Sequence, residues 1–411
     1  MDEQDDSRPA ADKTAPPEPT LPPADWTICA VDAHSLIFQV FHAMHGSELS
    51  SPSGEPVGAV YGFTRDMLQL IERQQPDAVF CAFDLAGPTF RHDLYDAYKA
   101  DRSEMPIELS AQIPKIQQML EALGIPILTS EGYEADDVLA TIARLCDESG
   151  ARCLIVTGDK DCRQLISDQV AVYNIRKDEV YDAEALKNDW GIRPDQVVDF
   201  QALVGDKIDN VPGVPLIGPK LARELLEKFG TVEEVLDHAD EVSGKKRRQN
   251  LIDHREDALL SRRLVELDRN VPVAPNWQDG RVGQVQHERL AELFREFGFR
   301  SLAERAAALA GEGAPAAAAP WEADYQVIDT PEALAELVDE ASSQPLISID
   351  TETTDRLPRQ ADLVGYSLAW KPGVAYYLPV RGPVGAQLLD PDATADALRP
   401  LLENPALANI G

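Results

Sequence analysis

The amino-acid sequence predicts a mixed α/β fold with a parallel sheet in its first domain, and two observations support this. Three short apolar runs each end in a carboxylate: residues 27–32, 77–84 and 153–159. Stretches with helical periodicity lie between and beside these runs: residues 60–72, 110–123 and 134–148. Buried strands that alternate with helices are typical of βαβ units, whose strands pair in parallel.

The composition limits the classes of protein to which the chain can belong. Its 38 Lys and Arg oppose 71 Asp and Glu, so the net charge of −33 argues against a polybasic coat for nucleic acid. Five cysteines without a CxxC pair fit neither a disulfide framework nor a zinc site. No apolar run approaches the ~20 residues of a membrane helix, and the acidic start MDEQDDSRPA is unlike a signal peptide. We therefore expect a cytoplasmic protein without membrane contact.

Shifts in composition divide the chain into five expected parts. The first is a disordered, acidic, Pro-rich tail, because such a segment buries too little apolar surface to offset its ordering entropy. The parts are the tail (1–25), an α/β core (26–190), a mostly helical subdomain (191–310), the linker GEGAPAAAAP (311–320) and a second α/β domain (321–411). In the last part, residues 345–353 and 361–370 are the expected strands.

Acidic side chains recur at strand ends and helix starts along the first two parts. Nine are candidates: Asp32, Asp84, Glu134, Asp136, Asp137, Asp159, Asp161, Asp206 and Asp209. A single Asp after a strand usually caps a helix or forms a turn, but the ends of parallel strands meet at one edge of a sheet. Carboxylates gathered there would raise one another's pKa and destabilise the fold unless cations neutralised them. Hard oxygen ligands suit Mg²⁺ or Mn²⁺, and two such ions ~3.5–4 Å apart promote phosphodiester hydrolysis.

The spacing within two of the acidic motifs supports this interpretation. Glu134 and Asp137 are three residues apart and would share one face of a helix. Asp159 ends a strand and Asp161 enters the next turn, so the two carboxylates would approach one ion from different sides.

Five motifs occur in one order: AVDAHSLIFQVFHA, FDLAGPTFRHDLYDAYKADR, EGYEADDVLAT, VTGDKDCRQL and LVGDKIDNVPGVPLIGPKLA. In order and spacing they resemble the 5′-nuclease (flap endonuclease) domain of bacterial family A DNA polymerase I, over about residues 26–310. The resemblance implies a PIN-like core with a helix-hairpin-helix subdomain. It also implies 5′-3′ exonuclease and flap endonuclease activity, on branched or flapped duplex DNA and on RNA-primed 5′ ends, in replication and repair.

The resemblance also assigns roles to the acidic and basic residues of these motifs. Asp32, Asp84, Glu134 and Asp136 would hold the first metal ion, and Asp159, Asp161, Asp206 and Asp209 the second, with Asp137 beside them. Asp136 and Asp159 are further expected to be catalytic. Lys99 and Arg102 match basic residues of the family's arch helix, which steer the scissile phosphate, and Arg91 is a weaker candidate for that task. Tyr98 would stack on the displaced base.

The segment NVPGVPLIGPKLA resembles the family's helix-hairpin-helix element. Gly213 and Gly218 would permit the tight turn, and amides at the following helix N-terminus, next to Lys220, would bind phosphate without reading sequence. The resemblance also allows a K⁺ ion between hairpin carbonyls and DNA. Four adjacent basic residues, Lys245, Lys246, Arg247 and Arg248, are a candidate contact with the duplex backbone, and a solvated helix face explains them equally well.

Two positions depart from the family pattern. Gln39 stands where a basic residue is common, so one phosphate contact is expected to be missing or displaced. Leu216 stands where a third hairpin Gly is common, which puts the detailed backbone conformation of the hairpin in doubt.

The C-terminal segment SIDTETT resembles the first motif of an RNase H-like 3′-5′ proofreading exonuclease domain. Asp350 and Glu352, two residues apart on a strand, would point to one face and share a metal pair. The later acidic motifs of that domain are absent before Gly411, so we expect a truncated and incomplete proofreading domain.

Two other functions remain open. A PIN-like ribonuclease needs fewer carboxylates and lacks the hairpin, and a DNA-structure-binding module would be non-catalytic. For the leading hypothesis we expect a monomer associated with the nucleoid.

Overall fold

A computed structural model describes residues 19–44, 49–102, 105–309, 324–354, 361–371, 373–383, 385–404 and 407–410. The chain forms two compact units, Met1–Ala314 and Pro315–Gly411. The expected linker (311–320) and most of the expected tail lie outside the described residues. The last residues of that tail were expected to be disordered, but they are ordered. The Thr20 carbonyl accepts a hydrogen bond of 2.8 Å from the Trp277 indole. Within the described ranges, no helix is long and apolar enough to cross a membrane.

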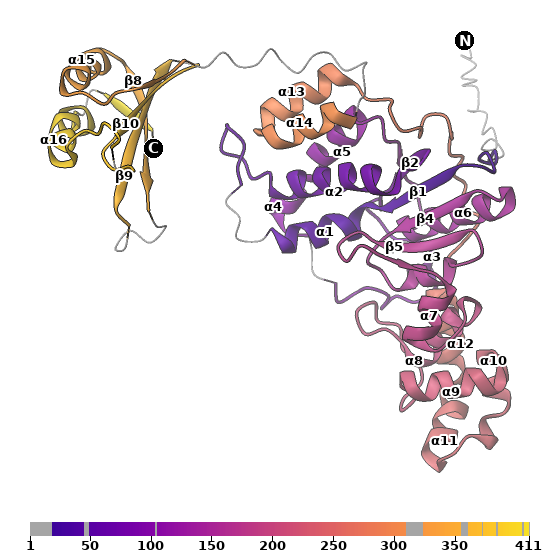
Figure 1. The fold of residues 1–411 in the computed structure, drawn as a ribbon. Helices are drawn as coiled ribbons and strands as arrows, with labels where there is room; N and C mark the ends of the chain where they lie inside the picture. Colours follow the sequence, from indigo (N-terminus) through magenta and orange to yellow (C-terminus); the bar gives the residue numbers. More distant parts are fainter. Residues whose placement is uncertain are drawn as a thin grey trace, which may run out of the picture. The chain divides into compact units, whose positions relative to one another are not determined.

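The first unit is built on a six-stranded sheet in the order β3-β2-β1-β4-β5-β6 (Figure 1). Its strands are β1 (Thr27–Asp32), β2 (Ala78–Ala82), β3 (Ile127–Leu128), β4 (Arg152–Val156), β5 (Val170–Asn174) and β6 (Glu179–Tyr181). All neighbours pair in parallel except β5 and β6. The expected parallel sheet is confirmed, although β3, β5 and β6 were not expected.

Helices cover both faces of this sheet, which explains the continuous apolar runs in its strands. Cys29 and Val31 of β1 pack towards α1, α2, α5, α13 and α14, whereas Ile28 and Ala30 pack towards α6 (Figure 1). The helices are α1 (Ala33–Ala43), α2 (Gly58–Gln74), α5 (Ile113–Ala122), α6 (Ala135–Ser149), α13 (His287–Phe297) and α14 (Arg300–Leu309).

Further helices complete the first unit. They are α3 (Phe90–Leu94), α4 (Ile107–Ser110), η1 (Asp161–Leu165), α7 (Ala183–Trp190), η2 (Pro194–Gln196), α8 (Val197–Val204), α9 (Pro219–Phe229), α10 (Val232–Asp237), η3 (Ala239–Glu241), α11 (Lys245–Asp253) and α12 (Arg255–Val265). The expectation of one helical subdomain over 191–310 needs a correction at its end. Leu290, Leu293 and Leu302 of the last two helices belong to the core that covers the sheet, because their apolar faces pack with α2 and α5.

The hairpin before α9 needs a glycine at one of the two expected positions. Gly213 has φ +62°, and a β-carbon there would overlap the backbone of Gly205. Gly218 has φ −93°, caps α9 and faces open space, so the turn does not require a glycine there. Leu216 is 57% exposed and adopts φ +70°, a conformation that strains a residue with a side chain. The departure from glycine therefore leaves the hairpin intact at a cost in strain.

The second unit has a five-stranded sheet in the order β11-β8-β9-β10-β7. Its elements are β7 (Asp324–Val327), α15 (Pro331–Ser342), β8 (Leu346–Thr353), β9 (Leu363–Lys371), β10 (Val374–Pro379), α16 (Pro391–Leu402) and β11 (Ala408–Ile410). The three strands β8, β9 and β10 pair antiparallel, while β7 and β11 join in parallel at the edges. Asp350 and Glu352 lie at exposed alternate positions of β8, opposite Ser367 and Gly365.

Candidate active site

The candidate site lies at the carboxyl edge of the first sheet. The strand order reverses around β1, and ligands of open α/β sheets bind beside such a reversal. Asp32 ends β1, Asp84 follows β2, and Asp159 follows β4. The parallel register thus brings together carboxylates that are more than 100 residues apart in the sequence.

Asp32 is fixed by two hydrogen bonds. One carboxylate oxygen accepts from the Ser35 amide at 3.0 Å and so caps α1, and the other accepts from the Thr157 hydroxyl at 2.8 Å. Burial raises the pKa of Asp32 to about 7, and the nearby charges of Asp84 and Asp159 add to that rise.

Asp84 links the end of β2 to the start of α6. Its carboxylate accepts from the Ala135 amide at 2.7 Å, and its own amide donates to His34 Nδ1 at 3.2 Å. Glu134, the residue before α6, is therefore held beside Asp84, and Asp136 lies in the first turn of the helix.

The GDKD segment forms a tight turn between β4 and η1. The Asp161 amide donates to Asp159 Oδ1 at 2.9 Å, and the Gln201 amide group of α8 donates to the Asp161 carboxylate. Burial, followed by the charge of Asp159, raises the pKa of Asp161 to about 7. The Cys162 thiol lies 3.3 Å from Asp136, whose pKa burial and the charges of Asp32 and Asp159 raise well above its usual value.

The structure therefore gathers eight of the nine candidate carboxylates. Asp32, Asp84, Asp136 and Asp159 repel one another electrostatically, and Glu134, Asp136, Asp161 and Asp209 line one small cavity. Asp206 joins them through Lys160, whose Nζ lies 2.6 Å from its carboxylate. Burial acts to raise the pKa of Asp206, but the hydrogen bonds from Lys160 and the backbone amides of Ile208 and Asp209, together with the charge of Lys160, outweigh burial and lower the pKa.

Lys99 and Arg102 reach this cluster from a distant segment. Lys99 Nζ lies 2.7 Å from Glu134 and 4.0 Å from Asp209, and Arg102 lies 2.6 Å from Asp209. The Lys99 amide also donates to the Asp209 carbonyl at 3.1 Å. Lys99 lies in a turn at φ +55°, and Arg102 directly follows the turn residues without helical structure, so the expectation that the two belong to a helix is wrong.

Arg91 and Asp137 do not have the roles expected from the sequence. Arg91 is 1% exposed and forms two hydrogen bonds of 2.7 Å with Asp137, which is fully buried. Arg91 also donates to the carbonyls of Leu264 and Glu266, at 2.8 and 3.0 Å. Because both side chains are buried and paired with each other, Arg91 is no surface phosphate contact and Asp137 is no metal ligand.

Tyr98 also departs from its expected role. It is 4% exposed, packs with Val211, Leu264 and Val265, and donates a hydrogen bond of 3.2 Å to Glu134. A ring buried in this way cannot stack on a base, so Tyr98 orients Glu134 instead.

The donor set fits a divalent cation by its chemistry. It consists of carboxylate oxygens, which are the ligands that such cations prefer. Burial in a pocket of like charge raises the pKa of three of the carboxyl groups, those of Asp32, Asp136 and Asp161. Within the described ranges, no three His, Cys, Asp or Glu side chains already converge on one cation position. Three of the acids instead pair with basic residues of the chain: Glu134 with Lys99, Asp209 with Arg102 and Asp206 with Lys160.

Several residues around the cluster were missed in the sequence. His34, Thr157, Cys162 and Gln201 carry no signal of their own, because only folding places them against acids distant in the sequence. Lys160 was recognisable within GDKD. Gln39, the departure noted above, donates to the Ser35 hydroxyl at 3.1 Å and lies against Gly158, where a β-carbon would overlap its amide.

The predicted hairpin and basic segment lie on the helices beyond this cluster. Gly218 and Lys220 stand at the start of α9, and the Asn250 side chain of α11 donates to the Pro215 carbonyl at 2.6 Å. Lys245, Lys246 and Arg247 begin α11, are exposed, and form no ion pair with the residues that the structure describes. Arg248 donates to the Val242 carbonyl at 3.3 Å.

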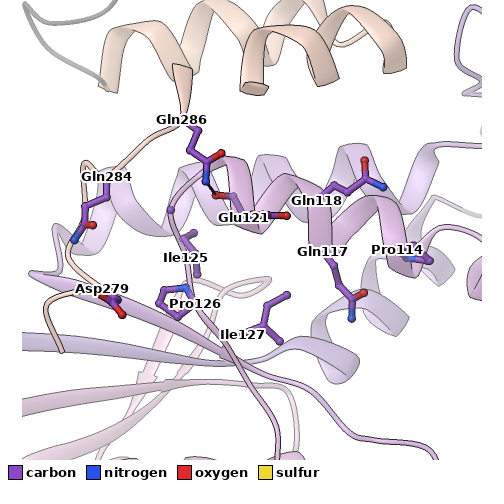
Figure 2. A pocket seen from close by; sticks show the side chains of 11 residues that line it. Pro114, Gln117, Gln118, Glu121, Ile125, Pro126, Ile127, Asp279, Gln284 and Gln286 are labelled. Carbon is purple, nitrogen blue, oxygen red and sulfur yellow. Dashed lines mark hydrogen bonds between the residues drawn. The ribbon is translucent and has the colours of Figure 1, made fainter. Parts of the chain in front are cut away.

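A cavity of about 700 Å³ lies elsewhere, between α5 and residues 279–286 (Figure 2). Its lining includes four glutamines, and Figure 2 shows Gln286 donating to the Glu121 carbonyl. None of the predicted site residues lines it.

Three models of protein families match the chain. A model of the 5′-3′ exonuclease N-terminal, resolvase-like domain matches residues 27–191, and one of the 5′-3′ exonuclease C-terminal SAM fold matches 192–288. A 3′-5′ exonuclease model matches residues 325–411.

Curated relatives share the same organisation. DNA polymerase I of Pseudomonas aeruginosa is 37% identical over 395 residues, which are 93% of this chain and 43% of the relative. DNA polymerase I of Chloroflexus aurantiacus is 36% identical over 414 residues, which are 91% of this chain and 44% of the relative. The chain thus spans less than half the length of these relatives.

Solved structures show the same fold. T5 5′-exonuclease with bound zinc ions has a TM-score of 0.51 and 22% identity, over 66% of this chain and 99% of that one. Bacteriophage T5 D15 flap endonuclease, in a pseudo-enzyme-product complex with DNA and metal ions, has a TM-score of 0.50 and 22% identity, over 68% and 99%.

The buried Arg91–Asp137 pair generates the first prediction. Arg91→Met leaves a buried carboxylate without its partner, so the free energy of unfolding should fall by about 3–5 kcal/mol. The matched control is Arg193→Ala, which removes the exposed ion pair with Asp195 and should cost about 1 kcal/mol or less. Urea unfolding measures both. The double variant Arg91→Met, Asp137→Leu should recover part of the loss; equal losses for Arg91→Met and Arg193→Ala would contradict the assignment.

The raised pKa of Asp32 leads to the second prediction, which concerns the pH dependence of stability. Its folded-state pKa of about 7 exceeds the ordinary 3.8, so its contribution to stability is present at low pH and is lost as the pH rises towards 7. Asp32→Asn keeps the cap without the charge. In EDTA, the variant should gain stability over the unchanged protein by up to about 1.4 kcal/mol per pH unit between pH 5 and 7. Urea unfolding at several pH values measures the difference in free energy of unfolding between the two proteins. A difference that does not change with pH would refute the prediction.

Proposed function

The chain belongs to the 5′-3′ exonuclease family and carries the two 5′-3′ exonuclease domains found in DNA polymerase I, and from this premise we propose how it acts. It removes nucleotides from 5′ ends and cuts 5′ flaps of branched DNA by divalent-metal-dependent hydrolysis. The observation that carries the proposal is the group of buried, mutually repelling carboxylates at the carboxyl edge of the sheet.

Two divalent cations, Mg²⁺ or Mn²⁺, fit these donors. Asp32, Asp84, Glu134 and Asp136 would hold one, and Asp159, Asp161, Asp206 and Asp209 the other. Bound cations would lower the pKa of the attacking water and neutralise the leaving oxygen. The T5 enzymes of the same fold, one with bound zinc ions and one with DNA and metal ions, support a divalent cation and a DNA substrate in general.

In this scheme Lys99 and Arg102 have two partners, a carboxylate of the cluster and the scissile phosphate. Lys99 and Arg102 touch the carboxylates that a cation would engage, so each can pass from a carboxylate to the scissile phosphate. Tyr98 keeps Glu134 in place through its hydroxyl. Thr157 and Gln201 orient Asp32 and Asp161 in the same manner.

The substrate side of the proposal rests on the helices beyond the cluster. Amides at the start of α9, with Lys220, suit a backbone phosphate, and hairpin carbonyls suit a K⁺ ion. RNA-primed 5′ ends are further substrates, and the protein acts as a cytoplasmic monomer at the nucleoid. Asp350 and Glu352 of β8 would be metal ligands of the 3′-5′ exonuclease domain, and the chain would be part of a DNA polymerase I.

Cleavage of a labelled 5′-flap duplex tests the activity. With Mg²⁺ the protein should release the flap, and Asp159→Asn should slow cleavage at least ~10²-fold, because it removes a carboxylate charge at the cluster. Binding of the flap by that variant should change little. Repeating the assay with Mn²⁺ tests the choice of divalent cation, and adding K⁺ tests the ion proposed at the hairpin. An RNA-primed 5′ end tests the further substrate.

The other two functions are outcomes of the same assay. A PIN-like ribonuclease would prefer linear single-stranded RNA to flapped DNA. A non-catalytic binding module would hold the flap without cutting it at any divalent-cation concentration. Undiminished turnover by Asp159→Asn would refute the metal assignment.

We also propose that the start of α11 contacts the duplex backbone. Replacing Lys245, Lys246, Arg247 and Arg248 with Ala should flatten the salt dependence of binding, by ~0.9 in slope for each phosphate that is no longer neutralised. Fluorescence anisotropy from 50 to 200 mM salt measures this slope. The matched control replaces Arg193, which pairs with Asp195 at 2.7 Å, and should leave the slope unchanged. A slope unaltered by the fourfold replacement would mean that α11 presents only a solvated face.

A further inference from the structure

A second cavity, of about 230 Å³, adjoins the carboxylate cluster and contains none of its acids. The end of α7, the outer face of α8, the start of α9 and Lys160 surround it. Two of its residues also touch the cluster: Lys160 pairs with Asp206, and Gln201 donates to Asp161. Pro219, the first residue of α9, connects it to the hairpin. The cavity therefore lies between the two regions proposed to bind DNA.

Arg223 supplies an unbalanced positive charge to this cavity. It is half-buried, and among the described residues it has no ion pair or hydrogen bond, in a chain of net charge −33. Its stem lies against Gly191, which ends α7 at φ +71° and where a β-carbon would overlap the Arg223 side chain. The negative end of α7 stabilises the guanidinium, but its donors lack an acceptor. An anionic oxygen is the acceptor that a guanidinium binds best.

Gln201 supplies an unsatisfied acceptor. The residue is 4% exposed, and its side-chain carbonyl oxygen is buried without a hydrogen-bond partner in the part of the chain that the structure describes. Leaving a buried acceptor unpaired costs about 1–3 kcal/mol, so a ligand that donates an N–H there would recover that loss.

Trp190 and Phe200 form an apolar wall that is already rigid. Their ring centroids lie 5.1 Å apart, and the Arg163 guanidinium covers Trp190 at 4.5 Å. Asp189 is the carboxylate in the cavity lining; Arg163 neutralises it at 2.9 Å, and the Tyr181 hydroxyl donates a hydrogen bond to it at 3.0 Å. Of the two positive side chains, Lys160 pairs with Asp206 of the cluster, and Arg223 has no ion pair among the described residues.

We propose that this cavity is a subsite for one nucleotide of the bound DNA strand. The phosphate lies between Lys160 and Arg223, the base packs against Trp190 and Phe200, and a base N–H donates to Gln201. The volume is below the ~300–1,000 Å³ of sites for drug-sized ligands, which suits a single nucleotide unit. The subsite rests on the proposed function, because it gives the nuclease a hold on the strand beside its cutting site.

Fluorine NMR of the protein labelled with 5-fluorotryptophan tests the subsite without catalysis. The chain has five tryptophans, and Trp190→Phe identifies the resonance of Trp190 by its loss. Titration with deoxyadenosine 5′-monophosphate in EDTA should shift this resonance saturably. Arg223→Ala should weaken the binding roughly tenfold, and Arg223→Lys less, because a charged hydrogen bond contributes about that factor. The control Arg193→Ala should bind as the unchanged protein does.

A further probe, inorganic phosphate, separates the parts of the proposal. Inorganic phosphate should bind more weakly than the nucleotide, and equal affinity would overturn the role of the aromatic wall and Gln201. No movement of the Trp190 resonance, or equal binding by Arg223→Ala, would overturn the subsite itself.

A third arm distinguishes a DNA strand from a free nucleotide. Flapped DNA bound to Asp159→Asn should shift the Trp190 resonance as the mononucleotide does; a shift with the mononucleotide alone would overturn the assignment to the strand. In cleavage assays, Arg223→Ala should raise KM with little change in kcat. If the unchanged protein does not cut flaps, the proposed function fails while the titration still decides whether the cavity binds a nucleotide.

Discussion

The concentration of like charge at one edge of the sheet is the constraint on which the rest of the first unit depends. Eight carboxylates meet there, and burial raises the pKa of Asp32, Asp136 and Asp161. Such a pocket is unstable unless positive charge enters it. Lys99, Arg102 and Lys160 supply that charge from inside the chain, and the same positions suit residues that would contact a phosphate. Stability and the proposed chemistry therefore share one set of contacts.

The Arg91–Asp137 pair solves a different problem in the same neighbourhood. Arg91 reaches the carbonyls at the end of α12, and Asp137 accepts from the amides of Glu134 and Asp268. One buried pair thus joins the start of α6 to the segment that follows α12. Because Glu134 is held in this way, the position of a candidate ligand depends on residues that face no solvent. Charged residues in a functional motif can serve the scaffold of the site instead of its chemistry.

The helices beyond the sheet extend the site outwards from the carboxylates. Asn250 of α11 holds the hairpin through the Pro215 carbonyl, and Ser261 of α12 accepts from the Gly213 amide at 3.0 Å. The cavity around Arg223 lies on the path from the cluster to this hairpin. The packing of α8 against α9 therefore forms the proposed subsite. Because the chain has fewer basic than acidic residues, the positions of the basic residues matter more for DNA binding than the total charge does.

The sequence alone determined the parallel α/β core, the order of the acidic motifs and the resemblance to a nuclease family, because apolar runs and motif spacing are local properties. It did not identify the short strands β3, β5 and β6, whose pairing depends on partners distant in the chain. Tertiary structure decided which acids share a pocket, that Tyr98, Arg91 and Asp137 are buried, and that Gly213 but not Gly218 needs to be glycine. Burial and the identity of a charged side chain's partner arise only when distant segments pack, so no local pattern encodes them.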